Sequence, residues 1–316
     1  MIIDWQHHFV PQELVNRRGG AAERPRREGD QADKHLEWMN AAGIDIAVLT
    51  SGGNTLEDCK TINDAYGNMM KEHPNRFVGL AACIPTLGDE NQKELDRAIN
   101  VLGLRGVCIG TQTERNNVDS DIFWPFYEMV YELDIPIFVH VGGPSEGLEA
   151  FDAKHSKYAL HPTLGFMTRD QSSTASIILG GILAKFPDLK IVVSHMGGGI
   201  SAIKDRFHMV LEHFGRGFWT NWGGTAPFDE PFEENFTKYF NKVYFDMAGY
   251  EGRMSAVKCA LININPERLL FATDYPPNFR DPQKARDYID NIRKLDLPSE
   301  SIELILGGTA AKLLSL

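Results

Sequence analysis

Short runs of apolar residues recur along the whole chain, each bounded by residues that favour turns. The runs lack the alternation of apolar and polar positions that marks a strand with one solvated face. Near-continuous Val, Ile, Leu and Phe is typical of strands that are buried on both faces in a parallel sheet. The runs predict eight strands: Ile2–Asp4, Ile46–Thr50, Phe77–Ala81, Gly106–Ile109, Ile135–His140, Ile191–His195, Val243–Asp246 and Leu269–Asp274.

Segments with apolar residues at helical spacing lie between these runs. Gly43 and Gly103 follow two of the segments as C-cap signals, and Pro187 ends a third because proline cannot continue the hydrogen-bond ladder. The predicted helices are Lys34–Ala42, Leu56–Lys71, Asn91–Leu102, Phe123–Leu133, Ser172–Phe186, Ser201–Phe214, Gly252–Ile262 and Asp281–Leu295.

Strand and helix alternate through the chain, which predicts the α/β class and a single (β/α)8 TIM barrel domain over residues 1–316. A doubly wound open sheet is the competing architecture. The sequence contains neither GxGxxG nor GxxxxGK[ST], so nucleotide phosphate binding is not supported and the closed barrel is favoured.

Three connections are too long for plain links between a strand and a helix, at about 10–33, 141–171 and 215–241. The first two follow strands, so a barrel places them on the C-terminal face, where active sites lie. The first is rich in arginine: Arg17, Arg18, Arg24, Arg26 and Arg27. Two interpretations stay open, a solvated charged loop and a loop whose arginines hold an anionic substrate.

The composition limits the classes of binding partner and the cellular compartment that we expect for the protein. The 316 residues carry a formal charge of −11, which disfavours binding to the phosphate backbone of nucleic acids. No apolar run reaches ~18 residues, and the N-terminus lacks the pattern of a signal peptide. The four cysteines form no CxxC pair, which favours buried, reduced thiols. We therefore expect a cytoplasmic protein with neither a nucleic acid nor a membrane partner.

Polar residues follow three of the buried runs, at the strand ends where a barrel places its catalytic groups. His140 ends one run, His195 ends the next, and Asp274 ends the last. Neutral imidazoles and a carboxylate that converge on one face form a site suited to a divalent metal.

A fourth cluster follows the first run, in the sequence Asp4-Trp5-Gln6-His7-His8. Side chains alternate along a strand, so Asp4, Gln6 and His8 are expected on one face and His7 on the other. One histidine at a strand end is a weak signal. Polar clusters at the ends of the first, fifth, sixth and eighth strands are a much stronger one.

These motifs together resemble the amidohydrolase superfamily, and within it the branch of aminocarboxymuconate-semialdehyde decarboxylase and related aromatic acid decarboxylases. The first motif reads D-W-Q-H-H-F-V-P over residues 4–11, where the family has D-x-H-x-H or D-x-E-x-H before an apolar pair and Pro. Residues 194–199 read S-H-M-G-G-G, residues 274–276 read D-Y-P, and residues 305–313 are similar to the closing helix of the family. The resemblance covers nearly the whole chain.

The resemblance implies roles for individual residues. His8 and His140 are expected to bind the metal, and Asp274 to bind it and handle protons. His195 is expected to activate a metal-bound water or to hydrogen-bond the substrate. Arg206, eleven residues beyond His195, matches an arginine that binds a substrate carboxylate in a neighbouring subunit's site, which implies a homodimer. The alternative is that Arg206 pairs with Asp205 or Glu212 on its own helix.

Gln6 departs from the family, which has His or Glu at this position. A neutral carbonyl oxygen is a weaker ligand for zinc than imidazole or carboxylate. Three alternatives stay open. Gln6 is a weak fourth metal ligand beside three strong ones; or the site works without metal, as in one lactonase branch; or the barrel is not catalytic.

The resemblance therefore implies metal-dependent, non-oxidative decarboxylation of a small aromatic or unsaturated carboxylic acid. The expected cofactor is a divalent metal, zinc before manganese, and the expected partner is a small anionic substrate. Hydrolysis of a lactone, ester or amide, with or without metal, is the alternative. A binding barrel without turnover is a weaker one.

Overall fold

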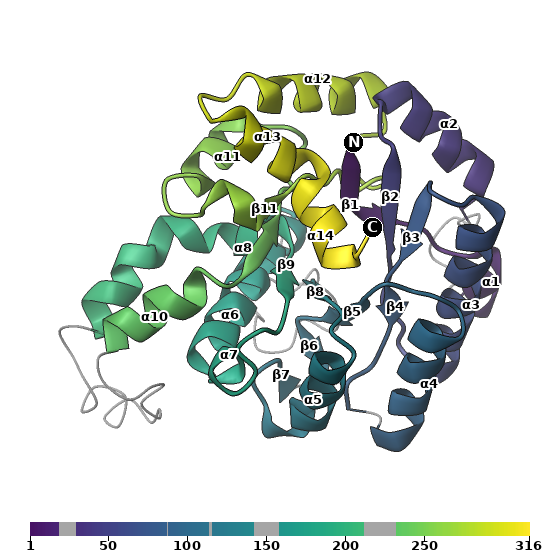
Figure 1. Ribbon diagram of the computed structural model, residues 1–316, viewed down its shortest axis with the longest axis horizontal. Helices are drawn as coiled ribbons and strands as arrows, with labels where there is room; N and C mark the ends of the chain where they lie inside the picture. The colour runs from purple at the N-terminus through teal and green to yellow at the C-terminus, as the bar shows by residue number, and fades with distance from the viewer. Residues whose placement is uncertain (19–29, 87, 114–115, 142–157, 212–231) are drawn as a thin grey trace.

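The computed structural model describes residues 1–18, 30–86, 88–113, 116–141, 158–211 and 232–316. Parallel strands surround a buried core, and helices cover their outer side (Figure 1). The strands of the barrel are β1 (Ile3–His8), β2 (Ile46–Thr50), β3 (Phe77–Gly79), β4 (Ala81–Ala82), β5 (Val107–Gly110), β8 (Ile137–His140), β9 (Ile191–Val193), β10 (Tyr244–Asp246) and β11 (Leu269–Leu270). The predicted strands are thus confirmed, although β8, β9, β10 and β11 are shorter than their apolar runs and β1 extends beyond Asp4 to His8.

The strands close into a ring through two seams. One ladder runs β1-β2-β3 and the other β4-β5-β8-β9-β10-β11, and all of their pairs are parallel. Only Leu80 separates β3 from β4, so these two act as one strand position. At the other seam, Trp5 N donates to Phe271 O at 3.0 Å and Asp274 N donates to Gln6 O at 2.9 Å. Among the described residues, eight strand positions therefore form the predicted barrel.

Helices form in each region where the sequence predicts one, with shifted ends. The outer helices are α1 (Gln12–Arg18), α2 (Ala32–Ala42), α3 (Leu56–Glu72), α4 (Gly88–Asn100), α5 (Trp124–Glu132), α6 (Phe166–Leu179), α7 (Ile182–Lys185), α10 (Phe232–Phe240), α11 (Met254–Ala260), α12 (Pro282–Arg293), α13 (Ser299–Glu303) and α14 (Thr309–Leu314). The predicted helix Ser172–Phe186 is divided into two helices at Gly180 and Gly181, and α13 and α14 were not among the eight predicted helices. A short hairpin joins β6 (Gln112–Thr113) to β7 (Asn116–Asn117).

All three predicted loops contain helix, and their boundaries were wrong. α1 lies inside 10–33, a π-helical turn at His161–Gly165 leads into α6 inside 141–171, and α10 lies inside 215–241. The start of α6 was missed because its first half carries the charged pair Arg169 and Asp170, which reads as surface but is buried. Residues 19–29, 142–157 and 212–231 lie outside the described part of the chain.

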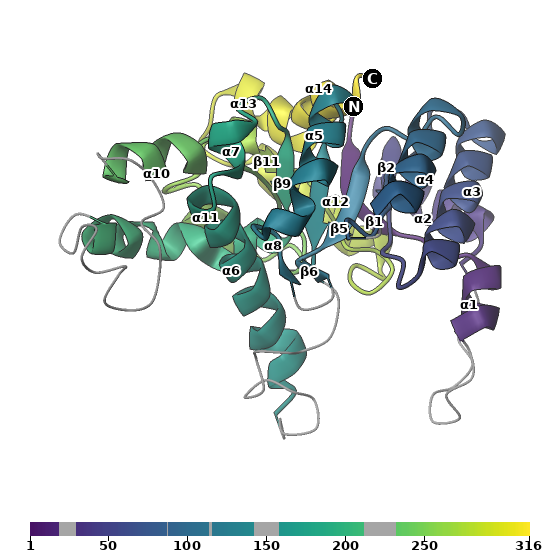
Figure 2. The same ribbon diagram turned by 90° about the horizontal axis from the view of Figure 1, so that it is seen from below.

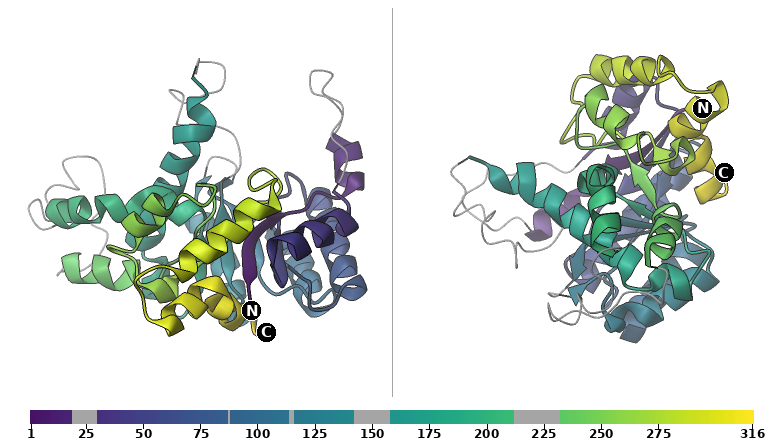
Figure 3. Two further views of the ribbon diagram at one scale, coloured as in Figure 1. Left: turned by 90° about the horizontal axis from the view of Figure 1, so that it is seen from above. Right: turned by 90° about the vertical axis from the view of Figure 1, so that its left-hand side faces the viewer.

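The barrel interior is apolar beneath the polar strand ends. Trp5 packs edge-on against Phe138, with ring centroids 6.1 Å apart. Leu313 and Leu314 of α14 join the same interior cluster from the side where both chain termini lie (Figure 3). Burying each such side chain stabilises the fold by roughly 1.5–3 kcal/mol. Helices α1 and α6 project from the opposite side, as Figure 2 shows.

A register shift in β1 sets which side chains face the barrel mouth. The pairing of β1 with β2 is irregular between Asp4 and His7, so strict alternation fails there. Asp4 contacts His7, whereas Gln6 and His8 contact the other strand-end residues. The expectation that Asp4 shares a face with Gln6 was therefore wrong, while the opposed directions of His7 and His8 are confirmed.

The cysteines are free thiols. Cys59, Cys83 and Cys108 are buried, as expected, but Cys259 on α11 is exposed, because its helix turns that face to solvent. Among the described residues, no helix has both the length and the apolar character needed to cross a lipid bilayer.

Candidate metal centre and its neighbours

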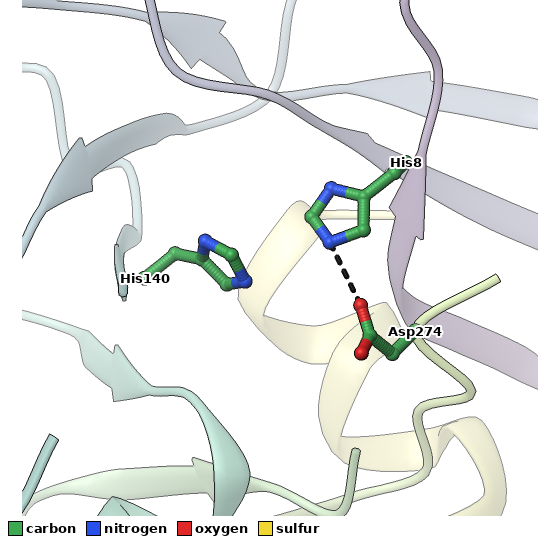
Figure 4. A group of neighbouring side chains, drawn as sticks. All are labelled: His8, His140 and Asp274. Atoms are coloured by element: carbon green, nitrogen blue, oxygen red, sulfur yellow. Dashed lines mark ion pairs between the residues drawn. The ribbon is translucent and has the colours of Figure 1, made fainter. Parts of the chain in front are cut away.

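Three predicted ligands converge at the C-terminal ends of the strands. His8 ends β1, His140 ends β8, and Asp274 follows β11. One nitrogen of each imidazole and one oxygen of the carboxylate all lie within 4.8 Å of one another. Figure 4 shows the two rings and the carboxylate directed toward a common point. Two imidazole nitrogens and a carboxylate oxygen form a donor set suited to zinc or manganese.

The backbone of a neighbouring strand fixes the ring of His8. Its Nδ1 lies 2.9 Å from Thr50 O and donates to it, which directs Nε2 into the site, 2.8 Å from Asp274 Oδ1. A second hydrogen bond of this kind orients metal-binding histidines. Burial would lower the pKa of His8, but the hydrogen bond and charge of Asp274 outweigh it and raise the pKa.

The pKa values of Asp274 and His140 are both lowered, but by different causes. Burial would raise the pKa of Asp274, but the hydrogen bond and charge of His8 outweigh it and lower the pKa. Burial, followed by the charges of His8 and His195, holds the pKa of His140 well below 6.5. The site therefore presents an ionised carboxylate and a neutral imidazole, the forms that bind metals.

The side chain of Gln6 lies among these residues. Its Nε2 donates to Asp274 Oδ1 at 2.8 Å and lies 3.1 Å from Nε2 of His140 and 3.3 Å from Nε2 of His8. His195 Nε2 is 3.4 Å away. The amide oxygen, Oε1, is buried without a hydrogen-bond partner. Gln6 is thus a member of the site.

His195 is held by two carboxylates that are not among the predicted ligands. Its Nδ1 donates to Asp170 Oδ2 at 2.8 Å, and Ser194 Oγ donates to Asp170 Oδ1 at 2.9 Å. Its backbone N–H donates to Asp246 Oδ1 at 2.8 Å. Burial would lower the pKa of His195, but Asp170 outweighs it and raises the pKa to about 9. Burial raises the pKa of Asp246 to about 7.

Sequence reasoning missed both carboxylates. Asp246 ends the seventh predicted strand, so the strand-end signal that found His195 and Asp274 was present for it too. Asp170 lies on α6 and carries no such signal. Asp170 could have been sought on chemical grounds alone. An imidazole that presents one nitrogen to a substrate usually has a hydrogen-bond partner, often a carboxylate, at its other nitrogen.

The S-H-M-G-G-G motif forms a left-handed turn that packs on α6. Residues 195–199, assigned as α8, all have positive φ, between 53° and 79°. A Cβ on Gly198 would lie 1.9 Å from Met167 O, so only glycine lets this turn approach α6 so closely. The turn and α6 together place His195 beside Asp170.

A second polar cluster lies behind β1, away from the site. His7 Nδ1 bonds Asp4 Oδ2 at 2.9 Å, and His7 Nε2 is 2.8 Å from His35 Nδ1. Asp4 also accepts from Thr273 N and Oγ1, at 2.8 and 2.6 Å. The cluster ties β1 to the residue before Asp274, and it explains why the first strand carries charge on both faces.

Two arginines, Arg206 and Arg17, were considered as groups that hold an anionic substrate. Arg206 is exposed on the helical segment 204–211 and makes no ion pair with Asp205; Glu212 lies outside the described residues. Arg17 lies near Glu13, Glu57 and Asp58 at 3.2 to 3.7 Å, so it belongs to a surface ion-pair cluster. For Arg17 the solvated-surface interpretation is supported.

Comparison with known proteins places this geometry in context. γ-Resorcylate decarboxylase of Polaromonas sp. is 26% identical over 278 residues, which make up 83% of this chain and 81% of the relative. The 2-amino-3-carboxymuconate-6-semialdehyde decarboxylase of Dictyostelium discoideum is 24% identical over 294 residues, 90% of this chain and 76% of the relative.

Solved structures share the fold over the whole chain. The structure of a dihydroxybenzoic acid decarboxylase from Polaromonas sp., with bound manganese and the inhibitor 2-nitroresorcinol, has a TM-score of 0.79 and is 25% identical. The match covers 100% of this chain and 97% of that one. The sequence profile described as "Amidohydrolase" matches residues 3–316. The resemblance seen in the motifs is thereby confirmed, and the chain belongs to the amidohydrolase family.

Proposed function

We propose that the protein is a metal-dependent decarboxylase that removes CO2, without oxidation, from a small aromatic or unsaturated carboxylic acid. The observation that carries the proposal is the convergence of His8, His140 and Asp274 beside His195 at the mouth of a barrel of this family. The relatives above are decarboxylases of such acids, which favours this reaction over hydrolysis of a lactone, ester or amide.

The donor set fits a divalent metal. His8, His140 and Asp274 would hold it, with Gln6 beside them. Zinc suits two imidazoles and a carboxylate, and manganese is bound in the Polaromonas structure. A bound metal would supply Lewis-acid polarisation of a substrate oxygen.

The chain's own residues then have distinct tasks. His195 Nε2 faces the site because Nδ1 is engaged by Asp170, so this atom is placed to hydrogen-bond the substrate and to hold a proton. The proton must reach the carbon that loses CO2, and Asp274 and His195 are the candidates to deliver it. We assign Arg206 to the substrate carboxylate in the site of a neighbouring subunit, which requires a homodimer.

The experiment is a substrate panel of hydroxybenzoates, carboxymuconate-like acids and pyrone lactones, run in deuterated and in 18O-labelled water. We expect release of CO2 and one solvent deuteron on the product carbon. Solvent oxygen in a new carboxylate, without CO2, would make the protein a hydrolase. No turnover of any compound by metal-loaded protein would favour the binding barrel.

Metal dependence is tested separately by metal analysis. Purified protein is expected to hold up to one zinc or manganese per chain, with lower occupancy in His8→Ala, His140→Ala and Asp274→Ala. Full activity after metal removal would contradict the metal-dependent mechanism. The cytoplasmic location also remains a prediction.

A further inference from the structure

The side-chain amide of Gln6 stands where four acceptor or basic atoms meet. Its Nε2 lies 2.8 to 3.4 Å from Asp274 Oδ1 and from one Nε2 each of His8, His140 and His195. An amide nitrogen has two hydrogens to donate and no free lone pair. Gln6 therefore acts as a hydrogen-bond donor within this group, and the carboxylate of Asp274 is its acceptor.

The carboxylate of Asp274 favours nitrogen, rather than oxygen, at this end of the Gln6 side chain. Asp274 Oδ1 accepts from Gln6 Nε2 at 2.8 Å and also lies 2.8 Å from Nε2 of His8. A carboxylate oxygen only accepts hydrogen bonds, so an amide oxygen turned toward Asp274 would be repelled by it.

The same place is also a ligand position. Donor atoms bound to one cation at about 2.0–2.2 Å lie roughly 3 Å from their nearest neighbours in an octahedral shell. The contacts of the Gln6 terminal atom match this spacing. A cation at the centre would attract oxygen to this vertex and would not accept NH2.

The amide oxygen is free to change places with the nitrogen. Oε1 is buried and has no hydrogen-bond partner within the described structure, so a turn of the amide breaks no bond at that atom. The turn sacrifices only the contacts of Nε2, of which the bond to Asp274 is the shortest. A cation bound to Asp274 would replace that bond.

We propose that the side-chain amide of Gln6 reverses its orientation when a metal binds. It donates a hydrogen bond to Asp274 when no metal is bound, and it acts as a weak metal ligand through Oε1 when metal is present. The neutral amide donates to Asp274 when no metal is bound, and it binds a cation less strongly than a carboxylate does. The inference rests on the proposed metal site and predicts an exchangeable metal.

The affinity test compares wild type with Gln6→Glu, using Gln12→Glu, an exposed glutamine on α1, as a charge-matched control. Metal-stripped proteins are titrated with Mn2+ by calorimetry and by thermal melting. Gln6→Glu is expected to tighten Mn2+ binding at least about tenfold, because a carboxylate replaces a neutral ligand. Metal-free Gln6→Glu is expected to melt below wild type, because the new carboxylate faces Asp274.

Two outcomes separate this inference from the proposed function. If His8→Ala abolishes Mn2+ binding but Gln6→Glu binds Mn2+ no more tightly than wild type, the reversal of the amide is refuted and the metal site stands. If wild type binds no Mn2+ and His8→Ala changes nothing, the metal site itself is refuted, and the reversal of the amide with it.

A spectroscopic test observes the Gln6 amide of the wild-type protein directly. The side-chain NH2 signal of Gln6 in 15N-labelled wild type is followed while diamagnetic Zn2+ is added to metal-stripped protein. It is assigned by its absence in Gln6→Glu or, if that variant does not fold, in Gln6→His. A large shift with faster hydrogen exchange is expected, because NH2 leaves Asp274. An unchanged Gln6 signal in protein that binds Zn2+ would overturn the proposal.

Discussion

At the scale of single residues, the ring of His195 is set by the carboxylate behind it. Asp170 is fully buried and accepts from both Ser194 and His195. It therefore acts through His195, as a positioning residue. Two strands and one helix must be in place before this histidine presents Nε2 to a substrate, so its function is not a property of the S-H-M-G-G-G motif alone.

The substitution Asp170→Asn keeps the shape of the side chain and removes its charge. We expect kcat to fall by roughly 10- to 100-fold with a smaller change in KM, because an uncharged partner supports a protonated imidazole poorly. Asp188→Asn, which removes an exposed carboxylate, is the control. Steady-state kinetics on a compound of the panel that the wild type turns over are the measurement, and an unchanged kcat would contradict the role of Asp170.

The same variant should change how stability depends on pH in metal-free protein. The pKa of His195 is raised from 6.5 to about 9 in the folded chain, so its contribution to stability is complete below pH 6.5 and is lost as the pH rises through about 9. Wild type is expected to lose unfolding free energy across this window, and Asp170→Asn to lose less of it. Urea unfolding at fixed pH values is the measurement.

The sequence revealed members of the site that lie at the ends of strands. His8, His140, His195 and Asp274 were found because a buried apolar run that ends in a polar residue is visible in one dimension. The bulge between Asp4 and His7 was not, because alternation assumes a regular strand. Asp170 was not, because its approach to His195 depends on how α6 packs in three dimensions.

At the scale of elements, the left-handed turn of residues 195–199 and α6 form one unit. Left-handed backbone is unfavourable for residues other than glycine by roughly 1–2 kcal/mol each. Both His195 and Met196 nevertheless adopt it, with φ of 53°. The packing of Gly197 against Phe245 of β10 and Thr174 of α6, and of Gly198 against Met167 of α6, compensates for this strain.

This packing predicts unequal effects for two neighbouring glycines. In Gly198→Ala the new methyl group would meet Met167 O, in addition to the strain of positive φ, and we expect a loss of roughly 2–5 kcal/mol in unfolding free energy. In Gly199→Ala no atom lies within 4 Å of the new Cβ, so only about 1–2 kcal/mol of backbone strain is expected. Denaturant unfolding measures both, and equal losses would show that contact with α6 is unimportant.

At the scale of the whole molecule, the residues that stabilise the barrel and the residues of the candidate site lie at opposite ends of the strands. The interior is apolar where α14 covers it, and polar side chains gather at the opposite strand ends. The eightfold alternation of buried strands and amphipathic helices made this architecture predictable from the chain. The long connections were not, because a short polar helix such as α1 has the sequence character of a loop.

Assembly is the prediction that belongs to this scale. If Arg206 serves a neighbouring site, mixed dimers of Arg206→Ala and His195→Ala chains contain one site with both groups intact. An equimolar mixture should then recover about a quarter of wild-type activity, since half of the dimers are mixed and half of their sites are complete.

Sedimentation of wild type, which should be dimeric, and rate assays of the mixture are the measurements. Arg293→Ala, an exposed arginine on α12 that pairs with Asp290 of its own helix, replaces Arg206→Ala in the control and should retain activity unmixed. An active monomer, or no recovery in confirmed mixed dimers, would exclude the shared site.

The contact between β1 and the segment after β11 can form only after nearly the whole chain has been synthesised. Gln6 and Asp274 are 268 residues apart in the chain, yet they touch in the finished site. At roughly 5–20 residues per second, a ribosome needs on the order of tens of seconds to make the intervening chain. Throughout that interval β1, with the large apolar surface of Trp5, has no partner along one edge. The chemical centre is therefore among the last parts of the barrel to exist, and β1 is the segment that a chaperone would have the most reason to shield.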